Sequence, residues 1–468
     1  MIIQLSHHIC LPDVPEPVAS HLKRMLTLQN PKWVDNNRQG RSNRGVPRDL
    51  TFYAPAPEGI CMPRGFMREL INTCRMFDLS FEIKDHRRSF PDIDLTFNGT
   101  LKPFQQTACD AILKKDFGVL TAPTGAGKTV MQLYLISRRR QPTLIIVHTK
   151  DLARQWIDRI ETFLSIPAAA VGMIGDGHNR IGDQVTVAMV QSLYKRVDEV
   201  VPRIGYVVVD ECHRAPSRTF TEAVTPFDAK YMTGLSATPW RRDRLSKLIF
   251  WHLGDAVHEV DKKHLIKQGD ILKAEICFRQ TDFQSDIDGS LYYTKLMKVL
   301  TQDQQRNIMI AADVAHAAEA ESGNGTCLVL SDRKIHCETI RALLKYRHGV
   351  DAELLTGDLK ATERKAVMDK LNNGAVKVLI ATSQLIGEGF DSNRLTTLFL
   401  IYPVKFSGRL IQYLGRILRP GPGKTHARVY DYVDIHVGVL EAAAKSRHTV
   451  YQQTGSLLPE KDLWGLMV

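Results

Sequence analysis

The chain has 468 residues, of which 44% are hydrophobic and 24% are charged, and its formal net charge is +11. This composition is ordinary for a globular protein with a large core, and the length predicts about three domains. No stretch approaches the run of about twenty apolar residues that crosses a bilayer, and the first residues lack the segments of a signal peptide. We therefore expect a cytoplasmic or nucleoid-associated protein with no membrane partner.

The excess of basic residues has two interpretations. The chain has 62 lysines and arginines against 51 aspartates and glutamates, which favours a polyanionic partner because binding neutralises phosphates and releases counterions. The same excess would also serve only to keep the protein in solution. On charge alone, nucleic acid is therefore one of two open alternatives.

The eight cysteines are scattered along the chain, and no two of them have CxxC spacing. A zinc ribbon needs such paired spacing, and a secreted disulfide scaffold is far denser in cysteine. We therefore expect all eight to be reduced and mostly buried thiols: Cys10, Cys61, Cys74, Cys109, Cys212, Cys277, Cys327 and Cys337.

Residues 1–95 predict a small α+β domain. "PVASHLKRMLTLQ" has a helical pattern, whereas "DLTFYAP" and "FDLSFEIKDHR" have the composition of strands. Between them lies the basic, Gly/Asn-rich stretch "VDNNRQGRSNRGVPRD". It is either a flexible loop that contacts phosphates, which would make this a DNA-engaging domain, or a solvated surface loop. Its arginines are Arg38, Arg41, Arg44 and Arg48.

From residue 96 onward, short apolar runs alternate with amphipathic helical patterns. Runs such as "PTLIIVHT", "IGYVVVD" and "VKVLIATS" are apolar throughout, which is typical of parallel strands covered by helices on both faces. A polar region near residues 240–288 interrupts this alternation. We predict two tandem α/β domains, 96–255 and 256–450, followed by a tail over 451–468.

One of the predicted helices spans "KDLARQWIDRIETFL", residues 150–164. Its apolar residues recur at helical spacing, so they fall on one face that would pack against a sheet. These residues are Leu152, Trp156, Ile160 and Phe163.

The stretch "TAPTGAGKTV", residues 121–130, fits the P-loop pattern with Ala122 in the first glycine position. Glycines let backbone N–H groups approach phosphate oxygens, and the N-terminus of the following helix adds positive potential. Lys128 would reach the β- and γ-phosphates, and the Thr129 hydroxyl would bind Mg²⁺. The predicted phosphate cradle consists of Thr124, Gly125, Ala126, Gly127, Lys128 and Thr129.

The stretch "YVVVDECH" ends a hydrophobic strand with four residue types that bind metals. A P-loop needs a further carboxylate for Mg²⁺ and a group that polarises water, and Asp210 and Glu211 fit these two roles. A zinc site is disfavoured because consecutive strand residues point to opposite faces, so Cys212 would not converge with them on one ion. Cys212 is therefore predicted to be a small filler at the strand end.

With "APTGAGKT" and "DECH" in place, the sequence resembles a superfamily 2 helicase or translocase of the DExH type over residues 101–434. Further motifs follow in the expected order: "LKPFQQ", "IVHTKDLARQW", "VAMVQSL", "GLSATP", "CLVLSDR", "LLTGD", "VLIATSQLIGEGFD" and "QYLGRILRP". The resemblance implies two tandem RecA-like parallel-sheet domains that use ATP and Mg²⁺. It also implies that Gln105 recognises adenine and that Asp391 reaches the nucleotide ribose.

The same resemblance implies a nucleic-acid track that contacts mainly the phosphate backbone. Ser236 and Thr238 would link the nucleotide site to this track. The implied contacts are Thr149, Lys150, Gln191 and Ser192 in the first RecA-like domain, and Thr356, Thr382 and Gly389 in the second.

The motif "QYLGRILRP" would complete the catalytic set. The resemblance makes Arg416 and Arg419 arginine fingers, so that hydrolysis depends on closure of the two domains. It places Gln412 against the acidic residues, with His213 as a hydrogen-bonding relay to Gln412 that couples hydrolysis to DNA. Each cycle of closing and reopening would then shift the two domains along the strand.

Within the superfamily, "TPWRRD", "IGEGFD" and "QYLGRILRP" are most similar to XPB-like, RadD-like and phage-encoded branch-migration helicases. We therefore expect an ATP-dependent DNA helicase that acts on forked, junction or duplex DNA in replication, recombination or repair, together with proteins of those processes. A phage-encoded protein of this kind would work in the host cytoplasm. Three alternatives stay open: a double-strand translocase without net unwinding, an RNA helicase, and a nucleic-acid-binding scaffold with a vestigial ATPase.

Overall fold

The computed structural model describes residues 1–56, 59–214, 218–237, 245–320, 325–386, 390, 392–404, 407–421, 424, 426–453 and 456. Three predicted site residues, Thr238, Gly389 and Asp391, lie outside this described part, as does most of the tail 451–468. In the part that is described, every helix is too short or too polar to cross a membrane.

The chain forms two compact units. The first consists of Met1–Pro123 and Gly127–Val260, and the second of Thr124–Ala126 and Asp261–Val468. The first unit holds two large sheets of different construction, one in the N-terminal domain and one in the region that follows it, beside a small two-stranded pair in the N-terminal part.

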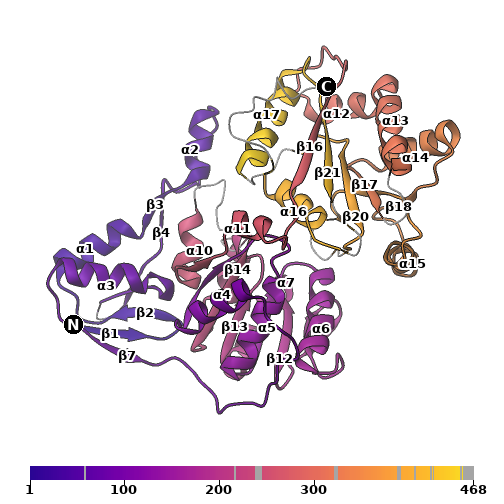
Figure 1. Ribbon diagram of the computed structural model, residues 1–468. Helices are drawn as coiled ribbons and strands as arrows, with labels where there is room; N and C mark the ends of the chain where they lie inside the picture. The colour runs from indigo at the N-terminus through magenta and orange to yellow at the C-terminus, as the bar shows by residue number, and fades with distance from the viewer. Residues whose placement is uncertain are drawn as a thin grey trace. The chain divides into compact units, whose positions relative to one another are not determined.

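The N-terminal domain is built on a mixed five-stranded sheet in the order β5-β6-β2-β1-β7. Alternate residues of β1, β2 and β6 are buried, and they pack against α1 and α3, which lie on the same face of the sheet (Figure 1). This confirms the predicted α+β character. The elements are β1 (Ile2–Leu5), β2 (His8–Leu11), α1 (Glu16–Met25), β5 (Ala54–Ala56), β6 (Gly59–Pro63), α3 (Met67–Met76) and β7 (Glu82–Asp85).

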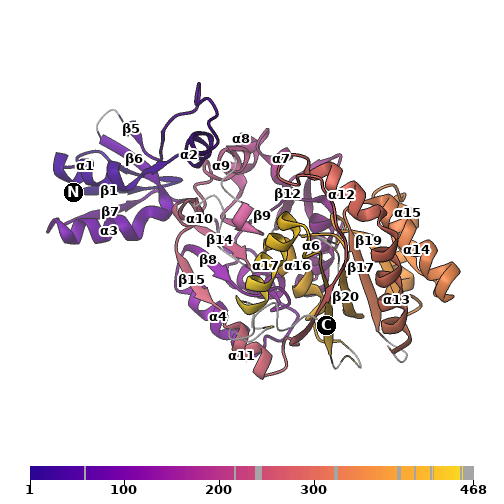
Figure 2. The same ribbon diagram turned by 90° about the horizontal axis from the view of Figure 1, so that it is seen from above.

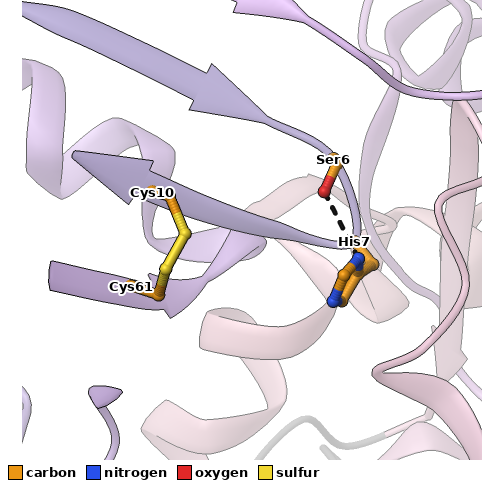
Figure 3. The surroundings of a disulfide bond; sticks show 4 residues. All are labelled: Ser6, His7, Cys10 and Cys61. Atoms are coloured by element: carbon orange, nitrogen blue, oxygen red, sulfur yellow. Dashed lines mark hydrogen bonds between the residues drawn. A yellow bond between two sulfur atoms is a disulfide. The ribbon is translucent and has the colours of Figure 1, made fainter. Parts of the chain in front are cut away.

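A disulfide joins Cys10 of β2 to Cys61 of β6 (Figure 3). The two residues are direct partners in the antiparallel ladder, with their Cα atoms 4.2 Å apart. The prediction that all eight cysteines are reduced is therefore wrong for this pair. The pairing could not be read from the sequence because 51 residues separate the two cysteines and only the strand register brings them together.

The arginine-rich stretch, for which the sequence leaves a flexible phosphate-contacting loop and a solvated surface loop open, is partly a helix and partly a turn held by hydrogen bonds. Its first residues form α2 (Pro31–Arg38). The Asn43 amide then donates hydrogen bonds to the side chain of Asn37 at 2.9 Å and to the backbone carbonyl of Trp33 at 3.3 Å. All four arginines are exposed. The strands β3 (Thr27–Gln29) and β4 (Asp49–Thr51) pair at the base of this segment.

The second sheet of the first unit has eight strands in the order β11-β10-β12-β9-β13-β14-β8-β15, and only β11 runs antiparallel to its neighbour. Every residue of β9 and β13 is buried, as expected for strands covered on both faces. The last strand, β15 (Ala256–Glu259), follows residue 255 and still belongs to this sheet. The other strands are β8 (Phe117–Thr121), β9 (Thr143–Val147), β10 (Gly172–Gly175), β11 (His178–Arg180), β12 (Val185–Met189), β13 (Tyr206–Val209) and β14 (Tyr231–Ser236).

Helices flank this sheet, and α6 shows how the amphipathic pattern is used. It buries Leu152, Trp156 and Ile160 as predicted. Ala153 and Leu164 are also buried, whereas Phe163, which was expected on this face, is only partly buried. The helices are α4 (Pro103–Leu113), α5 (Lys128–Arg139), α6 (Lys150–Leu164), α7 (Val190–Leu193), α8 (Val197–Val200), α9 (Arg218–Val224) and α10 (Ser246–Leu253).

Buried contacts fix the N-terminal domain to the eight-stranded sheet. Arg64, which is only 2% exposed, donates hydrogen bonds to the backbone carbonyls of Phe227 at 3.3 Å and Ala229 at 2.9 Å. The ring of Phe66 meets Trp251 of α10 edge-on at 5.8 Å between centroids. The N-terminal domain and this sheet therefore form one packed body.

The second unit contains six parallel strands in the order β16-β21-β20-β17-β19-β18, with helices packed around them (Figure 2). The two parallel-strand sheets confirm the predicted α/β class. The strands are β16 (Ala274–Gln280), β17 (Thr326–Ser331), β18 (Glu353–Leu355), β19 (Val378–Thr382), β20 (Leu395–Leu400) and β21 (Ala427–Val433), and the helices are α11 (Lys262–Lys267), α12 (Tyr293–Gln302), α13 (Gln304–Ala320), α14 (Lys334–His348), α15 (Ala361–Asn372), α16 (Ser407–Ile417) and α17 (Gly438–Gln453).

Candidate nucleotide and nucleic-acid site

The predicted site residues of the first unit gather at one edge of its eight-stranded sheet. The carboxyl ends of parallel strands meet at the same edge, which is where open α/β sheets bind ligands. Moving across the sheet from β12 to β9, β13, β14 and β8, the end of each strand contributes a group in turn. These are Gln191 and Ser192 after β12, Thr149 and Lys150 after β9, Asp210, Glu211 and His213 after β13, Ser236 at the end of β14, and Ala122, Gly127 and Lys128 of the phosphate loop after β8.

The phosphate loop has the backbone that its glycines predict. Gly125 and Gly127 have φ angles of +92° and +81°, in the left-handed region that glycine adopts without steric cost. The Lys128 ammonium donates a hydrogen bond to the backbone carbonyl of Ala122 at 3.1 Å, which holds the lysine side chain against the loop. Thr129 is partly exposed in the first turn of α5. This cradle fits the phosphates of a nucleotide.

Gln105 lies against the same loop. Its side-chain oxygen accepts a hydrogen bond from the backbone N–H of Lys102 at 2.9 Å, which orients the amide at the start of α4. A Cβ atom added to Gly127 would lie 2.5 Å from Gln105 Nε2. The structure therefore brings the residue predicted to recognise adenine next to the residues predicted to hold phosphate.

Asp210 is held in a buried position by a residue that the motif analysis missed. The indole Nε1–H of Trp156 donates a hydrogen bond to Asp210 Oδ2 at 2.8 Å, and the backbone N–H of Glu211 donates to Oδ1 at 2.8 Å. Burial and the negative charge of Glu211 raise the pKa of Asp210, while the Trp156 hydrogen bond and the charge of Lys128 lower it. A buried carboxylate that feels the charge of Lys128 is suited to bind Mg²⁺, together with the hydroxyl of Thr129 in the phosphate loop.

Glu211 and His213 form a second contact at the end of β13. Glu211 has a φ of +48°, a left-handed conformation that is strained for a residue with a side chain and is typical of functional sites. Glu211 Oε2 lies 3.2 Å from His213 Nδ1, and the same nitrogen lies 3.3 Å from the Ser236 hydroxyl. Gln412 belongs to the second unit, so the predicted His213–Gln412 relay stays a prediction. Cys212 is fully buried in the hydrophobic core.

The candidate nucleic-acid contacts of the first unit follow two adjacent strands. β9 and β12 are paired in parallel with Val147 opposite Met189, so the segments that follow them lie side by side. The Thr149 hydroxyl accepts a hydrogen bond from the N–H of Leu152 at 3.3 Å and caps α6. Lys150 and Gln191 are exposed, and Ser192 is partly exposed.

The second unit brings Thr356 and Thr382 together. β18 and β19 are paired in parallel, and both threonines line one cavity of about 380 Å³ at the ends of these strands. Arg409 and Lys334 line the same cavity. Arg409 pairs with Asp332 at 3.7 Å, and Lys334 pairs with Asp358. Hydroxyl groups that can donate hydrogen bonds, together with an arginine and a lysine, are suited to bind the phosphates of a nucleic-acid backbone.

The residues predicted as arginine fingers lie near the end of α16. Gln412 and Arg416 are four residues apart, one turn of this helix. Arg416 is 8% exposed, with its guanidinium 6.0 Å from the centroid of the Phe390 ring. Arg419 follows the end of the helix and is partly exposed.

Two family models match the chain at the places where these sites lie. "Type III restriction enzyme, res subunit" matches residues 98–241, and "Helicase conserved C-terminal domain" matches residues 295–421. Among solved structures, S. cerevisiae Dbp5 bound to RNA and ADP BeF3 has a TM-score of 0.52 with 17% identity, over 76% of this chain and 88% of that one. This likeness confirms the RecA-like fold.

The curated relatives are helicases and translocases. "DNA 3'-5' translocase XPB2" of Sulfurisphaera tokodaii is 28% identical over 68% of this chain and 78% of its own length. "Putative helicase 161L" of Invertebrate iridescent virus 6 is 26% identical over 97% of this chain and 99% of its own length. "Putative ATP-dependent RNA helicase L396" of Acanthamoeba polyphaga mimivirus is 27% identical over 78% of this chain and 70% of its own length.

A P-loop and an acidic pair at the carboxyl edge of a parallel sheet define a nucleoside-triphosphate-hydrolysing motor. With the two family models and these relatives, the chain belongs to the superfamily 2 helicases, and it is an ATP-hydrolysing helicase similar to XPB-like and viral members.

Proposed function

We propose that the chain is an ATP-dependent DNA helicase that translocates on DNA and unwinds or branch-migrates forked or junction DNA. Its work would fall in replication, recombination or repair, in a cytoplasm that contains the DNA, including a host cytoplasm if a virus encodes it. DNA is supported by the similarity to a relative named as a DNA translocase and by the net charge of +11.

The proposed ATPase roles follow from the edge of the first sheet. Lys128 and the loop backbone would bind the phosphates, and Gln105 would bind adenine. Thr129 and Asp210 would hold Mg²⁺, which when bound neutralises charge on the phosphates. Glu211 would orient the attacking water and accept its proton. Arg416 and Arg419 would stabilise the charge that develops during transfer.

One observation carries the coupling of this ATPase to DNA. β13, which bears Asp210 and Glu211, lies directly between β9, whose end bears Thr149, and β14, whose end bears Ser236. His213 contacts both Glu211 and Ser236. A movement of Asp210 or Glu211 would therefore reach Ser236 through His213, and it would reach Thr149, a proposed DNA contact, through the neighbouring strand β9.

The packing of the N-terminal domain against the first RecA-like sheet supports the proposal that this domain binds duplex or junction DNA. The Arg64 contacts make this domain one body with the first RecA-like sheet, so its exposed arginines move with that sheet. A basic surface fixed to one motor domain can hold a duplex arm while the motor advances.

The decisive experiment measures ATPase activity with single-stranded, duplex, forked and four-way DNA and with RNA, beside unwinding of forked and four-way substrates. We expect forked and four-way DNA to stimulate ATPase most and to be unwound. RNA as the strongest activator would contradict the DNA assignment.

The N-terminal part is tested with the variant Arg38→Ala/Arg41→Ala/Arg44→Ala. We expect weaker four-way junction binding, with the slope of log affinity against log salt reduced by about 0.9 for each phosphate that the variant no longer neutralises. ATPase stimulated by single strands should stay near wild type. Arg75→Ala, an exposed arginine on α3, is the matched control. Unchanged junction binding by the triple variant would remove the N-terminal domain from the proposal.

A double-strand translocase without net unwinding is the second candidate, favoured by the relative that is named a translocase. Displacement of a third strand from a triplex measures translocation along a duplex directly. Strong triplex displacement without fork unwinding would select this candidate.

A further inference from the structure

The N-terminal sheet gathers three metal-binding side chains from two neighbouring strands. His8 and Cys10 are two residues apart on β2 and therefore point to the same face, and Cys61 of β6 lies directly opposite Cys10. Their ligand atoms all lie within 4.8 Å of one another. In Figure 3 the side chains of Cys10 and Cys61 meet between their two strands.

This cluster lies on the face of the sheet that is turned away from the hydrophobic core. In both strands the core residues alternate with the cluster: Ile9 lies between His8 and Cys10, and Ile60 and Met62 flank Cys61. His8, Cys10 and Cys61 are each half-buried. An ion from solvent can therefore reach them without opening the core.

We propose that Cys10, Cys61 and His8 form a binding site for a soft divalent cation of the Zn²⁺ class when the two cysteines are reduced. This site is separate from the proposed helicase function, because no residue of the nucleotide or nucleic-acid site takes part in it.

The residue types and their spacing suit such an ion. Zn²⁺ binds thiolate sulfur at about 2.3 Å and imidazole nitrogen at about 2.0–2.1 Å, with tetrahedral geometry that separates two bound sulfurs by about 3.8 Å. The sulfurs of Cys10 and Cys61 reach that separation by side-chain rotation, since their Cα atoms, 4.2 Å apart, sit on paired strands that need not move. Water would fill the fourth position.

The disulfide and the ion exclude each other, because sulfurs bonded to one another are no longer thiolates. A dithiol reductant transfers two electrons and two protons to the Cys10–Cys61 bond and becomes a cyclic disulfide itself, which leaves two thiols. Binding of Zn²⁺ then releases the two thiol protons to solvent. Disulfides are rare in the reducing compartments where intracellular DNA is handled, so the proposed function favours the reduced form.

The test measures Zn²⁺ bound per chain, without ATP or DNA, in the presence of a phosphine reductant that does not compete as a thiol. We expect Cys10→Ser/Cys61→Ser to bind one equivalent less than the wild type. We expect His8→Ala to lower the affinity of this site for Zn²⁺ by about 10–100-fold or more. A loss of that size is typical when a group that only hydrogen-bonds to a metal ligand is removed, and His8 is proposed to be a ligand itself. Cys277→Ser, which removes a half-buried free thiol of the second unit, is the matched control and should bind as the wild type does.

Co²⁺ provides a second readout that needs only the wild-type chain. The reduced protein should show a thiolate-to-cobalt charge-transfer band in the near ultraviolet, and the protein oxidised to the Cys10–Cys61 disulfide should not. Absence of this band, or equal Zn²⁺ stoichiometry in the wild type and the double variant, would overturn the proposal. Neither result bears on the helicase function, which the ATPase and unwinding assays test independently.

Discussion

The two large sheets of the first unit carry functional side chains in different places. The eight-stranded sheet has central strands that are buried throughout, so its candidate groups lie only at the carboxyl ends of the strands. The N-terminal sheet has its core on one face, and its other face is half-buried and bears the His8, Cys10 and Cys61 cluster. A sheet that is covered on both faces can thus bind ligands only at the ends of its strands. A sheet that is covered on one face can also bind a ligand on its uncovered face.

Removing the proposed base at the sheet edge should have the largest effect. Glu211→Gln is nearly isosteric but cannot accept the proton of the attacking water, so DNA-stimulated ATP turnover should fall by about 10²–10⁴-fold while ATP binding is kept. Steady-state turnover and binding of a fluorescent ATP analogue measure the two quantities.

The matched control is Glu199→Gln, which alters a surface carboxylate paired with Arg196 and should leave turnover unchanged. Turnover of Glu211→Gln at the wild-type rate would mean that the edge of this sheet is not the hydrolytic site, and would favour a scaffold with a vestigial ATPase.

A smaller loss of ATPase activity should follow when the hydrogen bond that holds Asp210 is removed. Trp156→Phe keeps an aromatic ring in the buried position but removes the N–H that donates to Asp210. The Mg²⁺ concentration for half-maximal ATPase activity should rise by about 10–100-fold, as is typical when a partner of a metal ligand is removed.

Trp251→Phe shrinks a buried indole in the N-terminal core instead and should not change the Mg²⁺ dependence. If Trp156→Phe lowered the melting temperature as Trp251→Phe does and left the Mg²⁺ dependence unchanged, Trp156 would be only a packing residue.

The smallest effect is expected at the edge of the second unit's sheet. Thr356→Val and Thr382→Val keep side-chain volume but remove the hydroxyls that line the shared cavity. Each should weaken single-stranded DNA binding by about fivefold, the equivalent of one hydrogen bond of about 1 kcal/mol. Fluorescence anisotropy with a labelled strand measures this effect.

Thr449→Val removes an exposed hydroxyl on α17 and is the control. Binding by Thr356→Val and Thr382→Val that equals the binding of this control would place the DNA elsewhere on the second unit.

Local patterns in the sequence predicted the parallel sheets, the phosphate loop and the acidic pair. The glycines of "TAPTGAGKTV" have the left-handed angles that the pattern requires, and the apolar runs became buried strands. The same kind of pattern predicted α6, and three of its four expected residues are buried, together with Ala153 and Leu164, while Phe163 is only partly buried. These features could be predicted because all the residues that define each one lie within a few turns or one strand of each other.

The sequence by itself determined which chemical groups the protein has and in what order its strands, loops and helices carry them. Only the tertiary structure decided which distant groups meet: Trp156 with Asp210, 54 residues apart, and Cys10 with Cys61, 51 residues apart. Such contacts depend on strand order and register, which arise from packing across the whole sheet and leave no local pattern. For that reason the cysteines were expected to be separate reduced thiols, while the structure pairs two of them beside a histidine.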